Sequence, residues 1–470
     1  MSFSTVQFLF VFLPVAWAVF FLLPRRARNP VLALLSLLFC LWGGYRATAL
    51  LVGFTAFNWL AGLALARADK ARKPLLAGCV VLDLAVLGFF KYAGFVSENL
   101  ATLLPGAVPV VSIALPLGLS FYTFQGIAYC VDVAREDTPP ARNPVRFFLY
   151  MAFFAHVTSG PILRYGEHAP WLDPVSPERR ITLDRFCYGI KRFTLGLAKK
   201  ALLADQLGVF HNRVVSVPAA SVPAPVLLAG CTAYAFQLYY DFSGYSDMAV
   251  GLGEMFGITL PENFSYPFLS RTVGEFWRRW HITLGAWFKR YLYFPLGGSR
   301  CSTARTCFNL FVVFLCTGIW HGAAWQFVAF GVWHGLWSCA ERLGLARLLD
   351  RLPRWVSHLY FVAVGWVGFV LFGAPGLRQA LAELAGIFTW QAGDPGMTVT
   401  AFFGLREALL LLAAVALCGP VQMLAPRFRS WLWDRKPPCP LGTAVLLVLL
   451  FGSIVLVTVG NYQGFIYAQF

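Results

Sequence analysis

Two histidines occupy a repeated pattern within one apolar stretch of the chain. The sequence GIWHG, which contains His321, is followed thirteen residues later by GVWHG, which contains His334. An ionisable side chain is costly to keep in an apolar segment, so it is a functional candidate by default. Imidazole is neutral for much of the time near pH 7 and can still accept a proton, which suits a general base. The structural alternative is an imidazole that bridges two helices.

His321 and His334 could not share one reaction centre if a single helix carried both. Thirteen residues would place them about 140° apart around the axis and about 20 Å apart along it. Small residues follow His321, and Trp325 lies one turn further on, which predicts a tight apolar pocket and a neutral imidazole. His334 lies seven residues before Glu341, nearer a polar end of the segment. The sequence therefore favours His321 as the base and Trp325 as its support.

A third histidine, His281, lies in the dense stretch EFWRRWHITL. On one continuous helix, Trp277, Trp280 and His281 would share a face. Arg278 and Arg279 would point elsewhere. A buried histidine between indoles and bordered by arginines could bind an anionic thioester, with the guanidinium groups on its phosphates. Alternatively, the arginines only anchor an interfacial helix at the lipid headgroups.

Two carboxylates lie in the cluster YYDFSGYSD, beside several hydroxyl groups. Asp241 and Asp247 are six residues apart, so a regular helix would direct them to opposite sides and they would not form an acid/base pair. Asp247 could be an acid near a helix N-terminus. Asp241 could cap or orient a neighbouring group, and we assign it a supporting role only.

The elements that must position these side chains are membrane helices. The residues AVILMFWYC make up 58% of the 470 residues and charged residues only 13%, whereas soluble domains carry about 25% charged residues. Long apolar runs predict an all-α polytopic membrane protein with about eleven crossings, plus re-entrant or interfacial helices. The clearest runs are Val6 to Leu23, Val31 to Trp42, Ala47 to Ala66, Leu75 to Phe90, Val356 to Phe372, Ala408 to Cys418 and Leu441 to Val459.

The net charge of +16 would raise the question of nucleic acid in a soluble protein. Here the basic residues lie in short connectors, as on the cytoplasmic side of membrane proteins, and no nucleic-acid partner is expected. They alternate with neutral connectors at Gly43-Gly44 and from Leu103 to Val110, which predicts an N-terminus outside the cytoplasm. The basic residues are Arg25, Arg26, Arg28, Arg67, Lys70, Arg72, Lys73, Arg135, Arg142, Arg427, Arg429, Arg435 and Lys436.

Neither processing nor metal binding is indicated. Ala16-Trp17-Ala18 resembles a signal-peptide cleavage site, but no basic residue precedes it and the apolar run continues to Leu23. An uncleaved first crossing is therefore expected. The eleven cysteines are scattered without a CxxC pair and indicate small buried hydrophobes.

A series of motifs follows in order along nearly the whole chain. They resemble the membrane-bound O-acyltransferase (MBOAT) family, in particular its bacterial branch of alginate O-acetyltransferase membrane subunits and peptidoglycan-acetylating relatives. The resemblance implies one transmembrane domain over 1–470, with a motif-rich core at about 116–340 and tilted helices around a central funnel. The motifs are PLGLSFYTFQGIAYCVDV at 116–133, SGPILRY at 159–165, YYDFSGYSDMAVG at 239–251, EFWRRWHITL at 275–284, YLYFPLGG at 291–298, GIWHGAAWQFVAFGVWHG at 318–335 and the terminal FIYAQF.

The resemblance also implies roles for individual residues. The family's signature histidine, in the buried tunnel, maps to His321, and its second polar position in the centre maps to His281. Lys289-Arg290 departs from the usual basic residue followed by an aspartate, so any salt bridge of that aspartate is lost or reversed. His156, just before SGPI, stands where relatives usually carry other residues.

The activity implied is O-acyl transfer, with acetyl as the expected group. The donor would be a cytoplasmic thioester such as acetyl-CoA, with no bound cofactor, and the protein would lie in the bacterial inner membrane. The acceptor would be a hydroxyl of a periplasmic acetyltransferase or esterase-like partner, which serves an exopolysaccharide such as alginate. Two alternatives stay open: a transporter, which would make no acylated product, and a scaffold, in which His321 would be replaceable.

Overall fold

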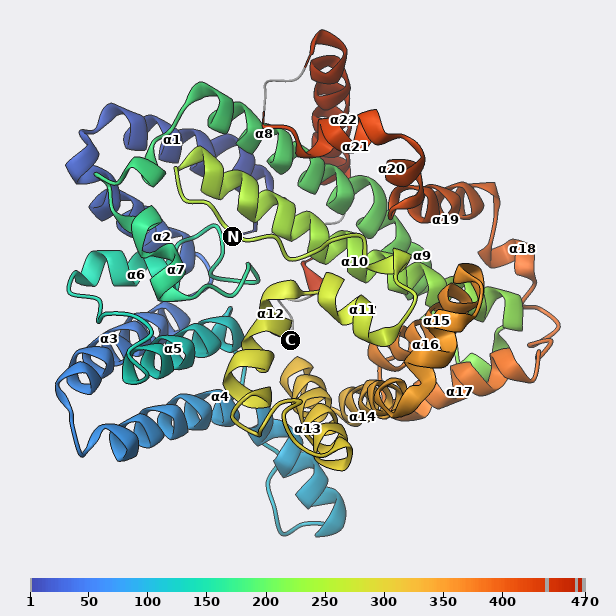
Figure 1. Cartoon of the computed structure of the whole chain (residues 1–470). Coiled ribbons are helices and arrows are strands. Elements are labelled where there is room, and N and C mark those ends of the chain that lie inside the picture. The colour runs from blue at the N-terminus through green and yellow to red at the C-terminus, as the bar shows by residue number, and fades with distance from the viewer. Residues whose placement is uncertain (1, 436–438, 461–463, 467–470) are drawn as a thin grey trace. The chain divides into compact units, whose positions relative to one another are not determined.

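The regular secondary structure in the described part of the chain is helical. The computed structural model describes residues 2–435, 439–460 and 464–466 (Figure 1). Within these ranges the one strand-like pairing is an isolated bridge between Phe264 and Trp280. The predicted all-α class is therefore confirmed. Lys436 and the last four residues of FIYAQF lie outside the described residues.

Two compact units can be distinguished by their internal contacts. The first unit takes residues 1–197, 245–262 and 435–470, and the second unit takes residues 198–244 and 263–434. Helix α10 (Ala224–Met255) contributes residues to both. The other helices of the first unit are α1 (Leu13–Leu22), α2 (Arg28–Leu41), α3 (Tyr45–Arg67), α4 (Arg72–Leu103), α5 (Leu119–Ala134), α6 (Pro144–Ala152), α7 (Tyr165–His168), nearly all of α8 (Leu183–Ala198), and α22 (Pro440–Val459).

The second unit holds all three histidines of the sequence-predicted site. Its helices are α9 (Asp205–Val215), α11 (Val273–Arg279), α12 (Ile282–Phe288), α13 (Thr303–His321), α14 (Trp325–Ala340), α15 (Ala346–Arg351), α16 (Arg354–Gly373), α17 (Leu377–Phe388), α18 (Val399–Phe402), α19 (Leu405–Leu417), α20 (Pro420–Leu424) and α21 (Pro426–Trp433).

Five helices are long and apolar enough to cross a bilayer, and they show that the chain is an integral membrane protein. They are α3, α4, α13, α16 and α22, with 23, 32, 19, 20 and 20 residues, against roughly 20 needed for a crossing. The apolar runs predicted as spans are helical at α1, α2 and α19 as well. The total of about eleven crossings and the central funnel stay predictions.

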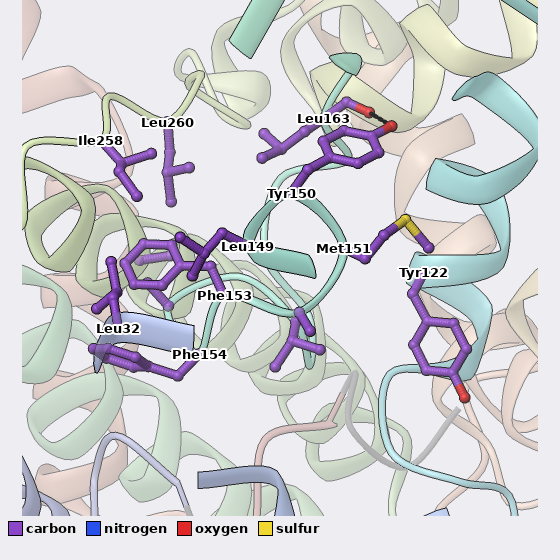
Figure 2. Close-up of a cluster of buried hydrophobic side chains, with 14 of the residues drawn as sticks. Leu32, Tyr122, Leu149, Tyr150, Met151, Phe153, Phe154, Leu163, Ile258 and Leu260 are labelled. Carbon is purple, nitrogen blue, oxygen red and sulfur yellow. Dashed lines mark hydrogen bonds between the residues drawn. The ribbon is translucent and has the colours of Figure 1, made fainter. Parts of the chain in front are cut away.

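The core of the first unit is built around α6 and the turn that follows it (Figure 2). Leu149, Phe153 and Phe154 have no measurable exposure and lie in one cluster with Leu32 and Leu260. Burying each such side chain contributes roughly 1.5–3 kcal/mol.

The first apolar segment belongs to the same core. Phe8 is fully buried, and its ring lies 6.4 Å from that of Phe154 between centroids. Ala16 and Phe20 of α1 are also fully buried. The packing of this segment agrees with its interpretation as an integral part of the protein.

In the second unit the two repeated histidine motifs lie on different helices. Helix α13 ends at His321, Gly322 is extended, and α14 begins at Trp325. A Cβ placed on Gly318 would lie 2.9 Å from the Cα of Gly331, so the two backbones touch. The assumption of a single helix was therefore wrong, because small residues in both motifs let the chain fold back into a tightly packed pair.

Candidate active site

The backbone around His281 is broken, and the expected single helix over EFWRRWHITL is wrong. Helix α11 ends at Arg279, Trp280 is extended, and His281 adopts the left-handed conformation with φ 45° and ψ 54°. The N–H of Ile282 donates to the carbonyl oxygen of Asn263 at 3.0 Å. Pairing with this distant segment replaces the local helical hydrogen bonds, so the faces expected for a continuous helix do not apply.

His281 lies deep in the second unit. It is 1% exposed, and its ring lies 4.7 Å from that of Phe242 and 6.0 Å from that of Trp320, both in edge contacts. Nδ1 of His281 lies 3.3 Å from Oδ1 of Asn263. In this connector between two seven-residue helices, burial lowers the pKa of His281 to about 3. The imidazole is therefore neutral near pH 7.

His321 ends α13 and is equally buried, at 1% exposure. Its ring is surrounded by those of Trp320 at 5.1 Å, Phe372 at 5.0 Å and Phe330 at 5.8 Å. The tight apolar pocket predicted for His321 is present. Trp325 does not lie one turn further along the same helix, because α13 ends at His321 and α14 begins at Trp325. The side chain of Trp325 is 55% exposed.

Trp320 joins the two candidate catalytic histidines into one aromatic cluster. Its ring contacts His281 at 6.0 Å and His321 at 5.1 Å, although the two histidines come from chain segments forty residues apart. Both imidazoles thus contact the same indole ring. Such an arrangement can accept and pass on a proton away from bulk water.

His334 has a different surrounding from His321. Its Nδ1 accepts a hydrogen bond from the indole Nε1 of Trp277 at 3.4 Å, and its ring lies 4.7 Å from that of Phe330. Gly368 of α16 approaches it so closely that a Cβ there would collide with the imidazole. His334 therefore joins α11, α14 and α16, as a helix-bridging histidine would.

Glu341, directly after α14, holds the start of α11. Its carboxylate accepts hydrogen bonds from the N–H groups of Val273 at 2.6 Å and Gly274 at 2.9 Å, and from Tyr360 Oη at 3.1 Å. The first N–H groups of a helix have no partner within the helix, and a negative charge suits that end. Helix α11 is thus fixed at its beginning by Glu341 and along its side by His334.

The aromatic and basic residues predicted to hold the donor have different environments. Trp280 is 3% exposed and packed against Phe264 and Phe276, and Trp277 is half-buried. Arg279 forms an ion pair with Glu275 at 2.7 Å. Arg278 is exposed.

Asp241 and Asp247 have separate cationic partners. Asp241 is 1% exposed and lies 2.7 Å from Nζ of Lys200, which is also 2.7 Å from Asp205. Asp247 pairs with the buried Arg192. Asp247 lies well inside α10, so its interpretation as an acid near a helix N-terminus was wrong. Asp241 is adjacent in sequence to Phe242, which contacts His281.

The residues that depart from the family pattern lie apart from this cluster in the chain. Lys289 and Arg290 open a turn after α12 and lie over the rings of Phe294 and Tyr291, at 5.7 Å and 5.8 Å. His156 is 2% exposed in the first unit, against Phe153.

Comparison with known proteins decides the family. A family model described as MBOAT, membrane-bound O-acyltransferase family, matches residues 139–372. The chain is 37% identical over its whole length to a probable alginate O-acetylase of Pseudomonas putida, which the match also covers completely. The chain belongs to the membrane-bound O-acyltransferase family. The family resemblance expected from the motifs is therefore confirmed, and the protein is a membrane acyltransferase.

Two further MBOAT relatives match at lower identity. The chain is 33% identical to a peptidoglycan O-acetyltransferase of Helicobacter pylori, over 82% of this chain and 79% of the relative. It is 29% identical to a teichoic acid D-alanyltransferase of Bacillus subtilis, over 47% of this chain and 57% of the relative. The part of the chain matched by the family model contains His281, His321 and His334.

Sequence reasoning missed several residues that shape this MBOAT site. Asn263 and Glu341 contact the site across 18 and 67 residues of chain, which no local pattern reveals. One local signal was present: Thr272 followed three residues later by Glu275 is typical of a helix start. Thr272 Oγ1 indeed accepts from the N–H of Glu275 at 3.0 Å, and α11 begins at Val273.

Proposed function

We propose that this MBOAT protein transfers an acetyl group from a cytoplasmic thioester, such as acetyl-CoA, to a hydroxyl on the far side of the inner membrane. The names of the alginate and peptidoglycan O-acetylating relatives support an acetyl donor and an envelope or exopolysaccharide pathway. The immediate acceptor would be a periplasmic acetyltransferase or esterase-like partner, or the polysaccharide itself. The N-terminus would lie in the periplasm.

The observation that carries the proposal is the contact of Trp320 with both His281 and His321. His321 would take the proton of the acceptor hydroxyl. The hydroxyl oxygen then forms a bond to the thioester carbonyl carbon, and the carbon–sulfur bond breaks. The leaving thiolate takes this proton from the imidazolium of His321, so the products are an ester and a free thiol.

His321 would suit this role because a base must be neutral before the reaction, and His321 is buried among aromatic rings. Its ring contacts the rings of Trp320, Phe330 and Phe372. A neutral imidazole is the form that can accept a proton, and a base with a pKa near the working pH is the most effective. His281 would act together with His321, since both contact the ring of Trp320.

Arg278 is the stronger candidate of the two arginines for the donor's phosphates. Arg279 is partly neutralised by Glu275, whereas Arg278 is exposed at the C-terminal end of α11. Trp277 and Trp280 would stabilise the position of α11 rather than contact the donor directly. Trp277 is hydrogen-bonded to His334, and Trp280 is packed in the interior.

The direction of transfer can be tested with sealed membrane vesicles. Labelled acetyl-CoA supplied outside inverted vesicles, whose cytoplasmic face is exposed, should label envelope acceptor material within them. Right-side-out vesicles, treated identically, should not be labelled from outside. Equal labelling of both kinds would contradict a cytoplasmic donor site, and the His321→Ala protein in inverted vesicles controls for unrelated acetylation.

A further inference from the structure

Asn263 lies in contact with His281 and has no role in the chemistry described above. It is fully buried, with 0% exposure. Its Oδ1 atom lies 3.3 Å from Nδ1 of His281, and it accepts from the N–H and the hydroxyl of Thr283 at 3.1 Å and 2.8 Å. Its carbonyl oxygen accepts from the N–H of Ile282. Main chain and side chain of one residue thus hold the turn that carries His281.

The contacts with Thr283 fix the orientation of the amide. A backbone N–H can only donate, so the amide atom that faces the N–H of Thr283 must be the oxygen. An amide oxygen can only accept, so Nδ1 of His281 must carry the hydrogen in its contact with Asn263. The neutral imidazole is then held in one tautomer, with the hydrogen on Nδ1 and the lone pair on Nε2.

The backbone conformation of His281 is strained, as is often found at functional residues. A left-handed conformation at a residue other than glycine is unfavourable and persists only where the surroundings impose it. Here the hydrogen bonds from Ile282 and Thr283 to Asn263, and the bridge between Phe264 and Trp280, impose it. Strain of this kind gathers at functional sites.

We propose that Asn263 is a positioning residue that fixes the tautomer of His281 and so makes Nε2 of His281 a hydrogen-bond acceptor. The inference rests on the proposed function in that His281 works in the acyl-transfer site. It adds the direction of the hydrogen bond that Nε2 of His281 can form. A neutral His281 in this state can accept a hydrogen bond at Nε2 and cannot donate one there to the negative oxygen of the tetrahedral intermediate.

The tautomer can be measured without reference to activity. In the full-length protein reconstituted in lipid and labelled with ¹⁵N-histidine, the signals of His281 are those lost in His281→Ala. We expect them to show a hydrogen on Nδ1. Asn263→Leu should abolish this state or mix it with the other tautomer, whereas Asn263→Asp, which keeps an acceptor oxygen, should retain it. Thr283→Val removes only the hydroxyl contact and is the matched control.

Activity gives the second readout. Asn263→Leu should lower kcat by about tenfold to a hundredfold, the range typical of partners that orient a working histidine, with little change in the donor KM. In a His281→Ala background the same substitution should have little further effect, since it acts through His281. If Asn263→Leu does not accumulate in the membrane, Asn263→Ala takes its place.

The two proposals fail in different ways. Unchanged His281 nitrogen signals in Asn263→Leu would overturn the positioning role, whatever the activity. A full additional loss of kcat on the His281→Ala background would overturn it as well, because it would show an effect independent of His281. Wild-type activity in His281→Ala would remove His281 from the proposed function, while the tautomer measurement would stand unaffected.

Discussion

The indole N–H of Trp277 donates a hydrogen bond to Nδ1 of His334 over 3.4 Å. This bond links α11, which carries Arg278 and Arg279, to α14. Because Nδ1 accepts, His334 must be neutral with its hydrogen on Nε2, and its basic nitrogen is already in use. This hydrogen bond indicates different roles for His334 and His321, although both lie in the same short sequence pattern.

His334→Ala should therefore destabilise the protein more than it slows the reaction. Loss of the imidazole leaves the indole N–H of the half-buried Trp277 without its acceptor, which costs up to about 1–3 kcal/mol. Thermal unfolding in detergent and acyl transfer per folded molecule would be measured on the same preparation. His334→Gln, which can still accept a hydrogen bond, is the matched control. A loss of turnover like that of His321→Ala at normal stability would contradict this assignment.

Substitutions of Arg278 and Arg279 should have different effects on the donor KM. Arg278→Gln is expected to raise the donor KM with normal protein level, because an exposed guanidinium can bind phosphates. Arg279→Gln should change KM less, since Glu275 already engages that side chain. Steady-state kinetics against acetyl-CoA would decide. An unchanged KM in the double variant would return both residues to the role of headgroup anchors.

The ion pair of Lys200 and Asp241 should be required for stability. Both side chains are almost fully buried, and breaking a buried pair typically costs about 3–5 kcal/mol because one charge stays uncompensated. Asp241→Asn should lower the melting temperature strongly. Asp205→Asn, at the more exposed partner of Lys200, should lower it less. Equal effects of the two substitutions would show that Asp241 is not the main counter-charge.

The topology prediction concerns the connectors at either end of α4. A reporter that is active only outside the cytoplasm should be active when fused near Pro105 and inactive near Lys70, because basic connectors mark the cytoplasmic side. Fusions of equal expression level would be compared. The reverse pattern would invert the orientation and move the donor site to the other face.

Local patterns in the sequence predicted three of the long helices well, whereas the run Leu75 to Phe90 covers only half of α4 and no predicted run corresponds to α10. The runs Ala47 to Ala66, Val356 to Phe372 and Leu441 to Val459 became α3, α16 and α22 with ends shifted by three residues or fewer. Composition alone suffices there, because a bilayer-spanning segment must be apolar and must satisfy its own backbone hydrogen bonds.

The site was predicted less completely, because contacts between distant segments shape it. The buried position of His321 was predicted from its neighbours in the sequence, and the polar end near His334 favoured a structural position for that residue. The break at His281 did not, since hydrogen bonds from Asn263 and pairing of Phe264 with Trp280 override the local helical pattern. Trp325 was misplaced for a related reason: backbone contact between Gly318 and Gly331 accompanies the folding back of α13 onto α14.

The central claim is that His321 is the base of acyl transfer. The most direct measurement is the single-turnover rate of transfer from labelled acetyl-CoA to the acceptor, with purified His321→Ala and His334→Ala compared at equal amounts of folded protein. A positioned base contributes roughly 10²- to 10⁴-fold. We predict a loss of that size in His321→Ala and a much smaller loss in His334→Ala. A near-normal rate in His321→Ala would contradict the mechanism.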